Sequence, residues 1–245
     1  QVYKADSKNA TSTGYIQGKG HSMDYSDQIL GRDQTAFVVY RAAEAYLNYI
    51  EASYELNGNI DSKADKYWRE LRTRAGVDPD YNKTIAATDM QKEAENDWGA
   101  YSHGQIIDKT LYNIRRERRC EFIGEGFRLD DLYRWRSLDQ LNGYQLEGCK
   151  IFGPMKTLFG DNLVYDQADE SKNNVSSPSL SLYLRPNQKT KANSYYNGFF
   201  FYQAHYLYPI AIQNFMNTAS DGKTTSESPI YQNPGWPMTA GSACE

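Results

Sequence analysis

The pattern of apolar residues between positions 35 and 76 is typical of two consecutive helices, and it constrains the fold more than any other feature of the chain. From Thr35, large apolar side chains recur at helical spacing until Asn57 and Gly58, a pair that favours the end of a helix. Asp61 is suited to cap a second helix that follows directly. Residues 35–76 are therefore predicted to form a helical hairpin.

The second predicted helix carries a small residue one turn before a bulky one, as tetratricopeptide repeats do. Ala64 and Trp68 lie four residues apart and share one helix face. A single helical repeat leaves its faces uncovered, so it needs neighbouring helices. The partner helices should therefore lie before residue 1 or in the rest of this chain. Because no second copy of the pattern occurs in the chain, we favour the first possibility.

The middle of the chain is predicted to contain a long loop and then a second pair of helices. Residues 77–103 are polar with scattered aromatic side chains, which indicates a long connection. Residues 104–141 are predicted to form two helices, over about 105–123 and 128–141, because apolar residues recur there at helical spacing. The glycine-rich break at 124–126 separates them.

The C-terminal region has the composition of irregular structure. Residues 142–245 are rich in Gly, Asn, Ser and Tyr and contain many turn signals. They predict short strands, with a hairpin around Asn197 and Gly198 that joins two aromatic segments. The expected fold class is therefore mainly α, with tetratricopeptide-like helical hairpins and a large, loop-rich C-terminal region.

The densest charged stretch of the chain runs from Arg115 to Trp135. Its later part, beginning at Glu125, alternates acidic and basic residues every third position, which allows guanidinium and carboxylate groups to pair between two helices. We interpret this stretch as an internal ion-pair network. A catalytic role for Glu121 and Glu125 in glycoside hydrolysis is the alternative, but neighbouring arginines would keep both ionised, whereas the general acid needs a raised pKa.

Charge also argues against nucleic acid as a partner. The formal net charge is −4, and acidic residues neutralise the arginines of the dense stretch. The 21 tyrosines, against 9 phenylalanines, instead indicate surfaces that combine flat apolar faces with polar tips. Such a composition suits a wet binding surface.

Five segments in a fixed order resemble the SusD/RagB family. They are AEAYLNYIEA at 43–52, LRTRAGV at 71–77, ERRCEFIGEGFRLDDLYRW at 117–135, YLYPIAI at 206–212 and QNPGW at 232–236. The resemblance extends over roughly residues 36–236 and looks like the C-terminal half to two-thirds of a family member. One departure is Ala211, where the family usually has a second proline.

The resemblance implies a mainly helical, non-enzymatic protein with no catalytic residues and no cofactor. Such proteins lie over a SusC-like TonB-dependent transporter on the outer face of the outer membrane and capture oligosaccharides for it. A lipid anchor would be the only membrane contact, and both the anchor and further helices are expected upstream of this chain. A helical-repeat scaffold that binds only proteins stays open as an alternative.

Aromatic residues in irregular segments are the candidates for a sugar site, because the C–H faces of sugars stack on aromatic rings while amides and carboxylates bind the hydroxyls. The first choice is the group around Trp98, followed by a second group in the same connection. The candidates are Trp98, Tyr101, Asp97, Asn96, Tyr81 and Asn82. The three histidines are too scattered to predict a metal site.

Other aromatic residues are assigned to packing or to a partner surface. Trp68 and Trp135 have core spacing, and Trp236 is interpreted as a structural anchor. The segment YYNGFFFYQAHYLY at 195–208 is predicted to be either a buried strand or a surface held against the transporter.

Overall fold

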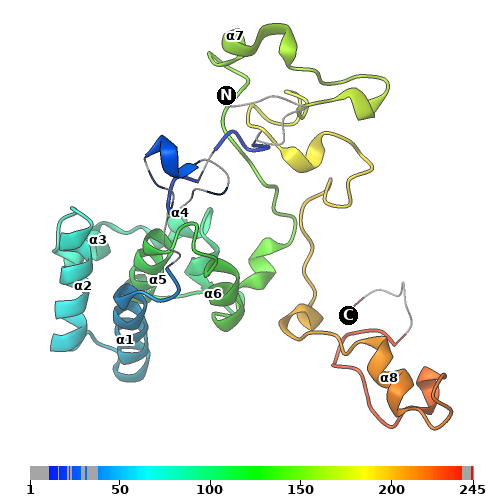
Figure 1. Ribbon diagram of the computed structural model, residues 1–245. Helices are drawn as coiled ribbons and strands as arrows, with labels where there is room; N and C mark the ends of the chain where they lie inside the picture. The colour runs from blue at the N-terminus through cyan, green and yellow to red at the C-terminus, as the bar shows by residue number, and fades with distance from the viewer. Residues whose placement is uncertain are drawn as a thin grey trace.

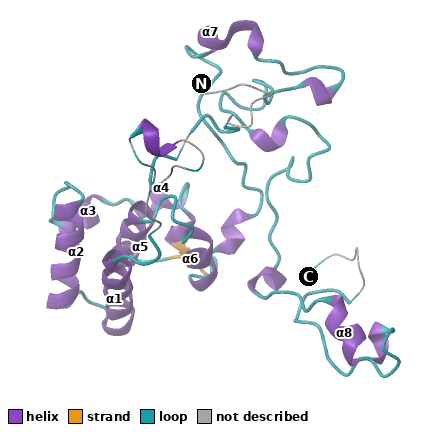
Figure 2. Ribbon diagram, viewed as in Figure 1, coloured by secondary structure: helices purple, strands orange, loops and turns teal. Residues whose placement is uncertain are grey.

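The computed structural model describes residues 11–15, 17–20, 22, 24–28, 31, 38–238 and 244. This part of the chain is mainly helical with long irregular segments, as the sequence predicted (Figure 2). Figure 1 shows three parts: a helical part with α1 to α6, a loop-rich part with α7, and a C-terminal part with α8. No helix among the described residues is long and apolar enough to cross a membrane.

The α-helices and strands have the following bounds. The helices are α1 (Ala42–Asn57), α2 (Ser62–Arg74), α3 (Tyr81–Ala87), α4 (Met90–Ala94), α5 (Lys109–Glu121), α6 (Arg128–Arg134), α7 (Lys156–Phe159) and α8 (Ile212–Thr218). The antiparallel strands are β1 (Tyr101–Ser102) and β2 (Gln105–Ile106). Short 3-10 helices lie at Tyr25–Gln28, Trp98–Ala100, Leu138–Leu141, Gly160–Asn162, Glu170–Lys172, Pro186–Gln188, Gln203–Tyr206 and Thr225–Glu227.

The predicted helical hairpin is present as α1 and α2. Gly58 ends α1 in the left-handed region with φ 68°, and its N–H donates to the carbonyl of Tyr54. Asp61 caps α2 by accepting the backbone N–H groups of Lys63 and Ala64. The expected start at Thr35 lies outside the described residues, and residues 38–41 are not helical.

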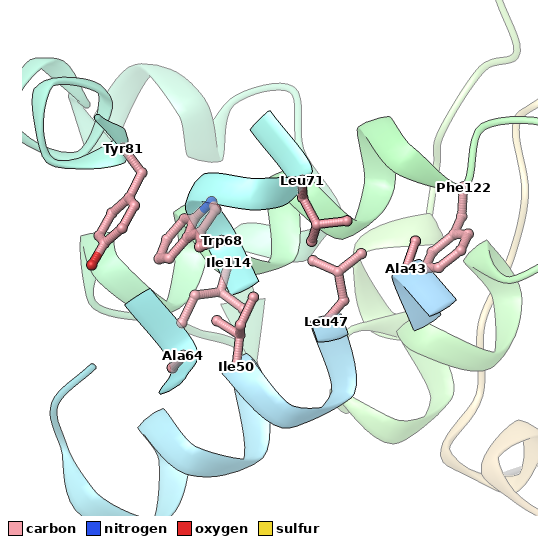
Figure 3. Close-up of a cluster of buried hydrophobic side chains, with 9 residues drawn as sticks. All are labelled: Ala43, Leu47, Ile50, Ala64, Trp68, Leu71, Tyr81, Ile114 and Phe122. Atoms are coloured by element: carbon pink, nitrogen blue, oxygen red, sulfur yellow. The ribbon is translucent and has the colours of Figure 1, made fainter. Parts of the chain in front are cut away.

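The largest apolar core lies between the hairpin and α5 (Figure 3). Trp68 is 1% exposed and stacks on Tyr81, with ring centroids 4.0 Å apart. Its indole Nε1 donates to Glu117 on α5 over 2.9 Å. Ala64 is fully buried, so both members of the predicted small-and-large pair are core residues. Within the described chain, α5 covers the hairpin face that the repeat pattern would otherwise leave open.

The connection at 77–103 is not the continuous loop that the sequence predicted. It contains α3, α4, the 3-10 helix Trp98–Ala100 and strand β1. The side chains of Asp80, Asp89 and Asp97 cap the three short helices by accepting backbone N–H groups. Each helix is too short to show a periodic pattern of apolar residues in the sequence. The three capping aspartates are the sequence signal that could have indicated these helices.

Both helices of the second pair are shorter than predicted. Residues 105–106 pair with β1, so α5 begins later, after its cap Asp108. The helix expected over 128–141 ends at Arg134, because Arg136 has φ 54° and its carbonyl accepts the N–H of His103 over 2.9 Å. A separate 3-10 helix follows at Leu138–Leu141.

The C-terminal region is irregular, but its predicted strand hairpin does not form. Gly198 does end a turn, since its N–H donates to the carbonyl of Tyr195 over 2.9 Å and its φ is 99°. The backbone of Phe199, however, bonds to two residues from another part of the chain: it donates to Tyr144 over 3.0 Å and accepts from Gly143 over 2.7 Å. In the described residues beyond 141, the only strand-like pairing is the isolated bridge between Lys150 and Tyr183.

Candidate functional site

A buried ion-pair network joins α1, α5 and α6, as the charge spacing predicted. Arg118 on α5 donates from Nε to both carboxylate oxygens of Asp131 over 2.8 Å. Arg134 donates to both oxygens of Glu51 over 2.7 and 2.6 Å. Trp135 adds a bond of 2.6 Å from its Nε1 to Glu51. These groups form hydrogen bonds and ion pairs with one another. This part of the family-like segments therefore stabilises the fold.

The last two family-like segments also bind each other. The amide side chain of Gln232 exchanges two hydrogen bonds with the backbone of Ile210, over 2.7 and 2.9 Å. Trp236 donates from Nε1 to the carbonyls of Ala204 and Leu207, each over 2.8 Å. The anchoring role predicted for Trp236 agrees with this geometry.

The carboxylates of the hydrolase alternative, Glu121 and Glu125, are held in the ionised state. Burial alone would raise the pKa of Glu121, but hydrogen bonds from Arg74 and Arg41 outweigh burial and lower that pKa below its ordinary value. Burial would also raise the pKa of Glu125, but hydrogen bonds from Arg41 and Lys19 outweigh burial and lower that pKa below its ordinary value. Neither carboxyl can supply a proton near neutral pH, as a glycosidase acid must.

Acid should therefore weaken the packing of α1 and α2 against α5. The folded-state pKa values of Glu121 and Glu125 are lowered, so their contribution to stability is complete above the unfolded value of about 4.3 and is lost as pH falls through the lowered folded values. Measuring the free energy of unfolding from about pH 7 down to about pH 2 should show this fall. The variant Arg41→Gln should have a shallower slope below about pH 4.3, and an unchanged slope would contradict the assignment.

Two of the six predicted site residues make contacts that stabilise the helical part of the protein. Tyr81 stacks on Trp68 and donates from its hydroxyl to Asp65 over 2.7 Å. Burial first, and then this hydrogen bond, raise the pKa of the Tyr81 hydroxyl. Asp97 is 5% exposed and pairs with Arg119 and Arg128 over 2.7 and 2.8 Å. Neither side chain offers a free face or a free oxygen to a sugar.

The other four predicted residues lie nearer the surface. Asn82 and Asn96 are exposed, whereas Tyr101 and Trp98 are half-buried. Trp98 packs on the cluster formed by α6 and the following 3-10 helix, and its ring forms an edge-to-face pair with that of Tyr144 at a centroid distance of 4.6 Å. Tyr81 and Asn82 begin α3 beside the hairpin core, so the structure does not place them in the cluster of Trp98.

Trp98 stands at one end of a continuous row of aromatic side chains, which we call the aromatic row. The next ring is Tyr144, which stacks on Phe199 at 6.3 Å. Tyr195 then contacts both Phe199 and Phe200, at 5.2 and 6.0 Å. Phe200 finally meets Tyr202 at 6.0 Å. The members of the row are Trp98, Tyr144, Tyr195, Phe199, Phe200 and Tyr202.

The aromatic row is accessible along most of its length. Tyr144, Tyr195, Phe200 and Tyr202 are 37%, 41%, 52% and 38% exposed. This exposure contradicts one of the two alternatives for residues 195–208, that of a buried strand. The hydroxyls of Tyr144 and Tyr195 have no hydrogen-bond partner within the described part of the chain. Flat rings with free polar tips are the groups that sugar recognition requires.

The geometry of the row follows from the backbone pairing of Gly143 and Tyr144 with Phe199. In Figure 1 the segment that leads from the helical part to the loop-rich part runs beside the segment that leads from the loop-rich part to the C-terminal part, where this backbone pairing joins them. Sequence reasoning placed Trp98 in a binding site but missed Tyr144, which lies alone in a Gly- and Asn-rich segment.

Among the described residues, no group of three or more His, Cys, Asp or Glu is placed to hold a metal ion.

The fold and this surface define a helical-hairpin protein with a large irregular region and an accessible aromatic surface. A model of the SusD family matches residues 2–236, and the chain belongs to this family. SusD family proteins are binding proteins rather than enzymes, and the family points to glycan binding in nutrient uptake. The curated proteins and the solved structures that we compared with the chain gave no match.

Proposed function

We propose that this protein binds oligosaccharides on the aromatic row and delivers them to a SusC-like TonB-dependent transporter. The observation that supports this function best is the exposure of four neighbouring rings in a protein of the SusD family. Exposed rings can take up the apolar faces of successive sugar units, and a row suits a chain-like ligand better than a single deep pocket.

Polar groups beside the rings would fix the sugar hydroxyls. The free hydroxyls of Tyr144 and Tyr195 point to hydrogen bonding with a bound glycan. At the other end of the row, Trp98 supplies the first ring, and the neighbouring Asn96 supplies an exposed amide. We keep Tyr101 in the proposed site because it is half-buried and follows Trp98 closely in the chain.

Removing exposed rings of the row should weaken glycan binding without unfolding the protein. We expect Tyr195→Ala and Phe200→Ala each to raise the Kd for the best glycan by about two- to twelvefold, because a lost aromatic contact is worth about 0.5 to 1.5 kcal/mol. Isothermal titration calorimetry measures the change. Tyr231→Ala is the matched control, since Tyr231 is 88% exposed and lies outside the row. An equal loss in the control, or no loss in either variant, would contradict the proposed site.

The proposed setting is the outer face of the outer membrane, with a lipid anchor in a segment upstream of this chain. The family supports this proposal, because its members are in general outer-membrane lipoproteins. Affinity purification of the full-length protein from its native membrane tests it. Recovery of a TonB-dependent transporter is the expected result. Stable binding to another protein, together with no carbohydrate binding, would favour a helical-repeat scaffold instead.

A further inference from the structure

A pocket of about 270 Å³ lies between the end of α5 and the start of α6, next to the aromatic row. We call it the arginine pocket. Its lining combines three guanidinium groups, one carboxylate, three large apolar side chains and two glycines. The lining residues are Arg118, Arg119, Arg128, Asp131, Phe122, Ile123, Phe127, Gly124 and Gly126.

The arginine pocket carries more positive than negative charge. Arg118 is neutralised by Asp131, which is itself shared with Arg134. Arg119 and Arg128 both pair with one carboxylate, that of Asp97. Because two guanidinium groups share a single buried anion, one positive charge lacks its own partner among the described residues. The carboxylate of a bound ligand would supply the missing partner.

Asp97 also holds the two arginines in place. It accepts the backbone N–H of Gly99 over 3.0 Å and the hydroxyl of Tyr112 over 3.2 Å, in addition to its two ion pairs. The side chains of Arg119 and Arg128 are 36% and 31% exposed, so their remaining N–H groups are within reach of a ligand. The cations are therefore positioned before a ligand arrives, which lowers the entropy cost of binding.

Part of the lining of the arginine pocket is apolar. Phe122 and Phe127 contact each other with ring centroids 4.5 Å apart, and Ile123 is 63% exposed beside them. Gly126 has φ 86° and open space where a Cβ would lie, so no side chain from that position narrows the pocket. A ligand with both an apolar face and an anionic group fits such walls.

The size and position of the arginine pocket indicate one unit of a longer ligand. Its volume is just below the range of about 300 to 1,000 Å³ typical of drug-sized ligands, so it suits a single ring. The guanidinium of Arg128 also lies 6.0 Å from the ring centroid of Trp98, the first member of the aromatic row. One glycan can therefore contact both surfaces.

We propose that the arginine pocket binds the carboxylate of a uronic acid, so that the glycan captured by this protein is an acidic polysaccharide fragment. This inference rests on the proposed glycan-binding function and adds the class of ligand. A phosphate monoester carries close to two negative charges at neutral pH, more than the single excess cation balances. A sulfate ester carries one charge, as a carboxylate does, but the planar carboxylate matches the fork of a guanidinium group, and the apolar lining suits the sugar ring that bears it.

The test compares acidic glycans with their neutral esters. Oligomers of galacturonic acid and of mannuronic acid, and the methyl ester of each, are titrated into the full chain by calorimetry. We expect at least one acid to bind about tenfold or more tightly than its ester, and its affinity to fall as salt is raised from about 50 to about 500 mM. Arg119→Gln should remove the preference for the acid, and Arg119→Lys should retain part of it.

Arg116→Gln is the matched control, because Arg116 also lies on α5 but pairs with Glu93 outside the arginine pocket. It should bind like the unchanged protein. Equal affinity for acid and ester, tighter binding of a neutral or a sulfated glycan, or an acid preference that survives Arg119→Gln would overturn the inference. Binding of neutral glycans on the aromatic row would in that case leave the proposed function standing, whereas loss of all carbohydrate binding would refute both.

Discussion

We expect Trp68→Ala to lower the free energy of unfolding by about 3 to 5 kcal/mol, the usual cost of removing a large aromatic side chain from a core. Trp68 is almost fully buried between the hairpin and α5 and stacks on Tyr81. The substitution leaves a cavity and also deprives Glu117 of a hydrogen bond from the indole. Such a loss is a large part of the stability of a typical domain, about 5 to 15 kcal/mol.

Chemical denaturation of the full chain measures this effect. Trp68→Phe should give a smaller loss, because it keeps most of the ring and removes only the hydrogen bond and part of the packing. Leu56→Ala is the control on α1, where the side chain is 83% exposed, and it should change stability by no more than about 0.5 kcal/mol. A loss below about 1 kcal/mol for Trp68→Ala would mean that the hairpin does not pack on α5 as described.

The second large effect is expected at the buried ion pair between α5 and α6. Asp131→Ala should lower the free energy of unfolding by about 3 to 5 kcal/mol, because it leaves the guanidinium of Arg118 buried without its anion. Both side chains of this pair are about 95% buried, at 6% and 4% exposure. Arg134, which shares Asp131, keeps its bonds to Glu51 and is affected less.

Two further variants separate the lost pair from other effects of substitution. Asp130→Ala changes the same residue type one position earlier, on the exposed side of α6, and should be close to neutral. The double variant Arg118→Met Asp131→Leu should be more stable than Asp131→Ala, since it buries no unpaired charge. If Asp130→Ala and Asp131→Ala lower stability equally, the network does not contribute as the geometry implies.

Local signals in the sequence were sufficient to predict the hairpin and the ion-pair network. The capping hydrogen bonds of Gly58 and Asp61 join them only to residues up to four positions away. Their roles at the end of α1 and the start of α2 can therefore be recognised without tertiary information. The prediction that α6 continues beyond Arg134 was wrong because the end of the helix depends on tertiary structure. Arg136 adopts a left-handed backbone while its carbonyl bonds to His103, a contact between distant parts of the chain.

The candidate site was only partly predictable. The criterion of aromatic residues in irregular segments selected Trp98, which is a member of the aromatic row, but it also selected Tyr81, which is buried against Trp68. Burial of this kind depends on which helices meet and has no signature in a short window of sequence. The meeting of Tyr144 with Phe199 depends in the same way on backbone pairing between distant segments.

The central claim is that this SusD family protein captures a glycan on its aromatic row, and a carbohydrate-array screen of the full-length protein tests it most directly. The double variant Tyr195→Ala Phe200→Ala should be screened beside it, after a thermal melt has shown that both proteins are folded. We predict selective binding to one class of glycan by the unchanged protein and its loss in the variant. Binding of no glycan by the folded protein, or equal binding by both proteins, would contradict the claim.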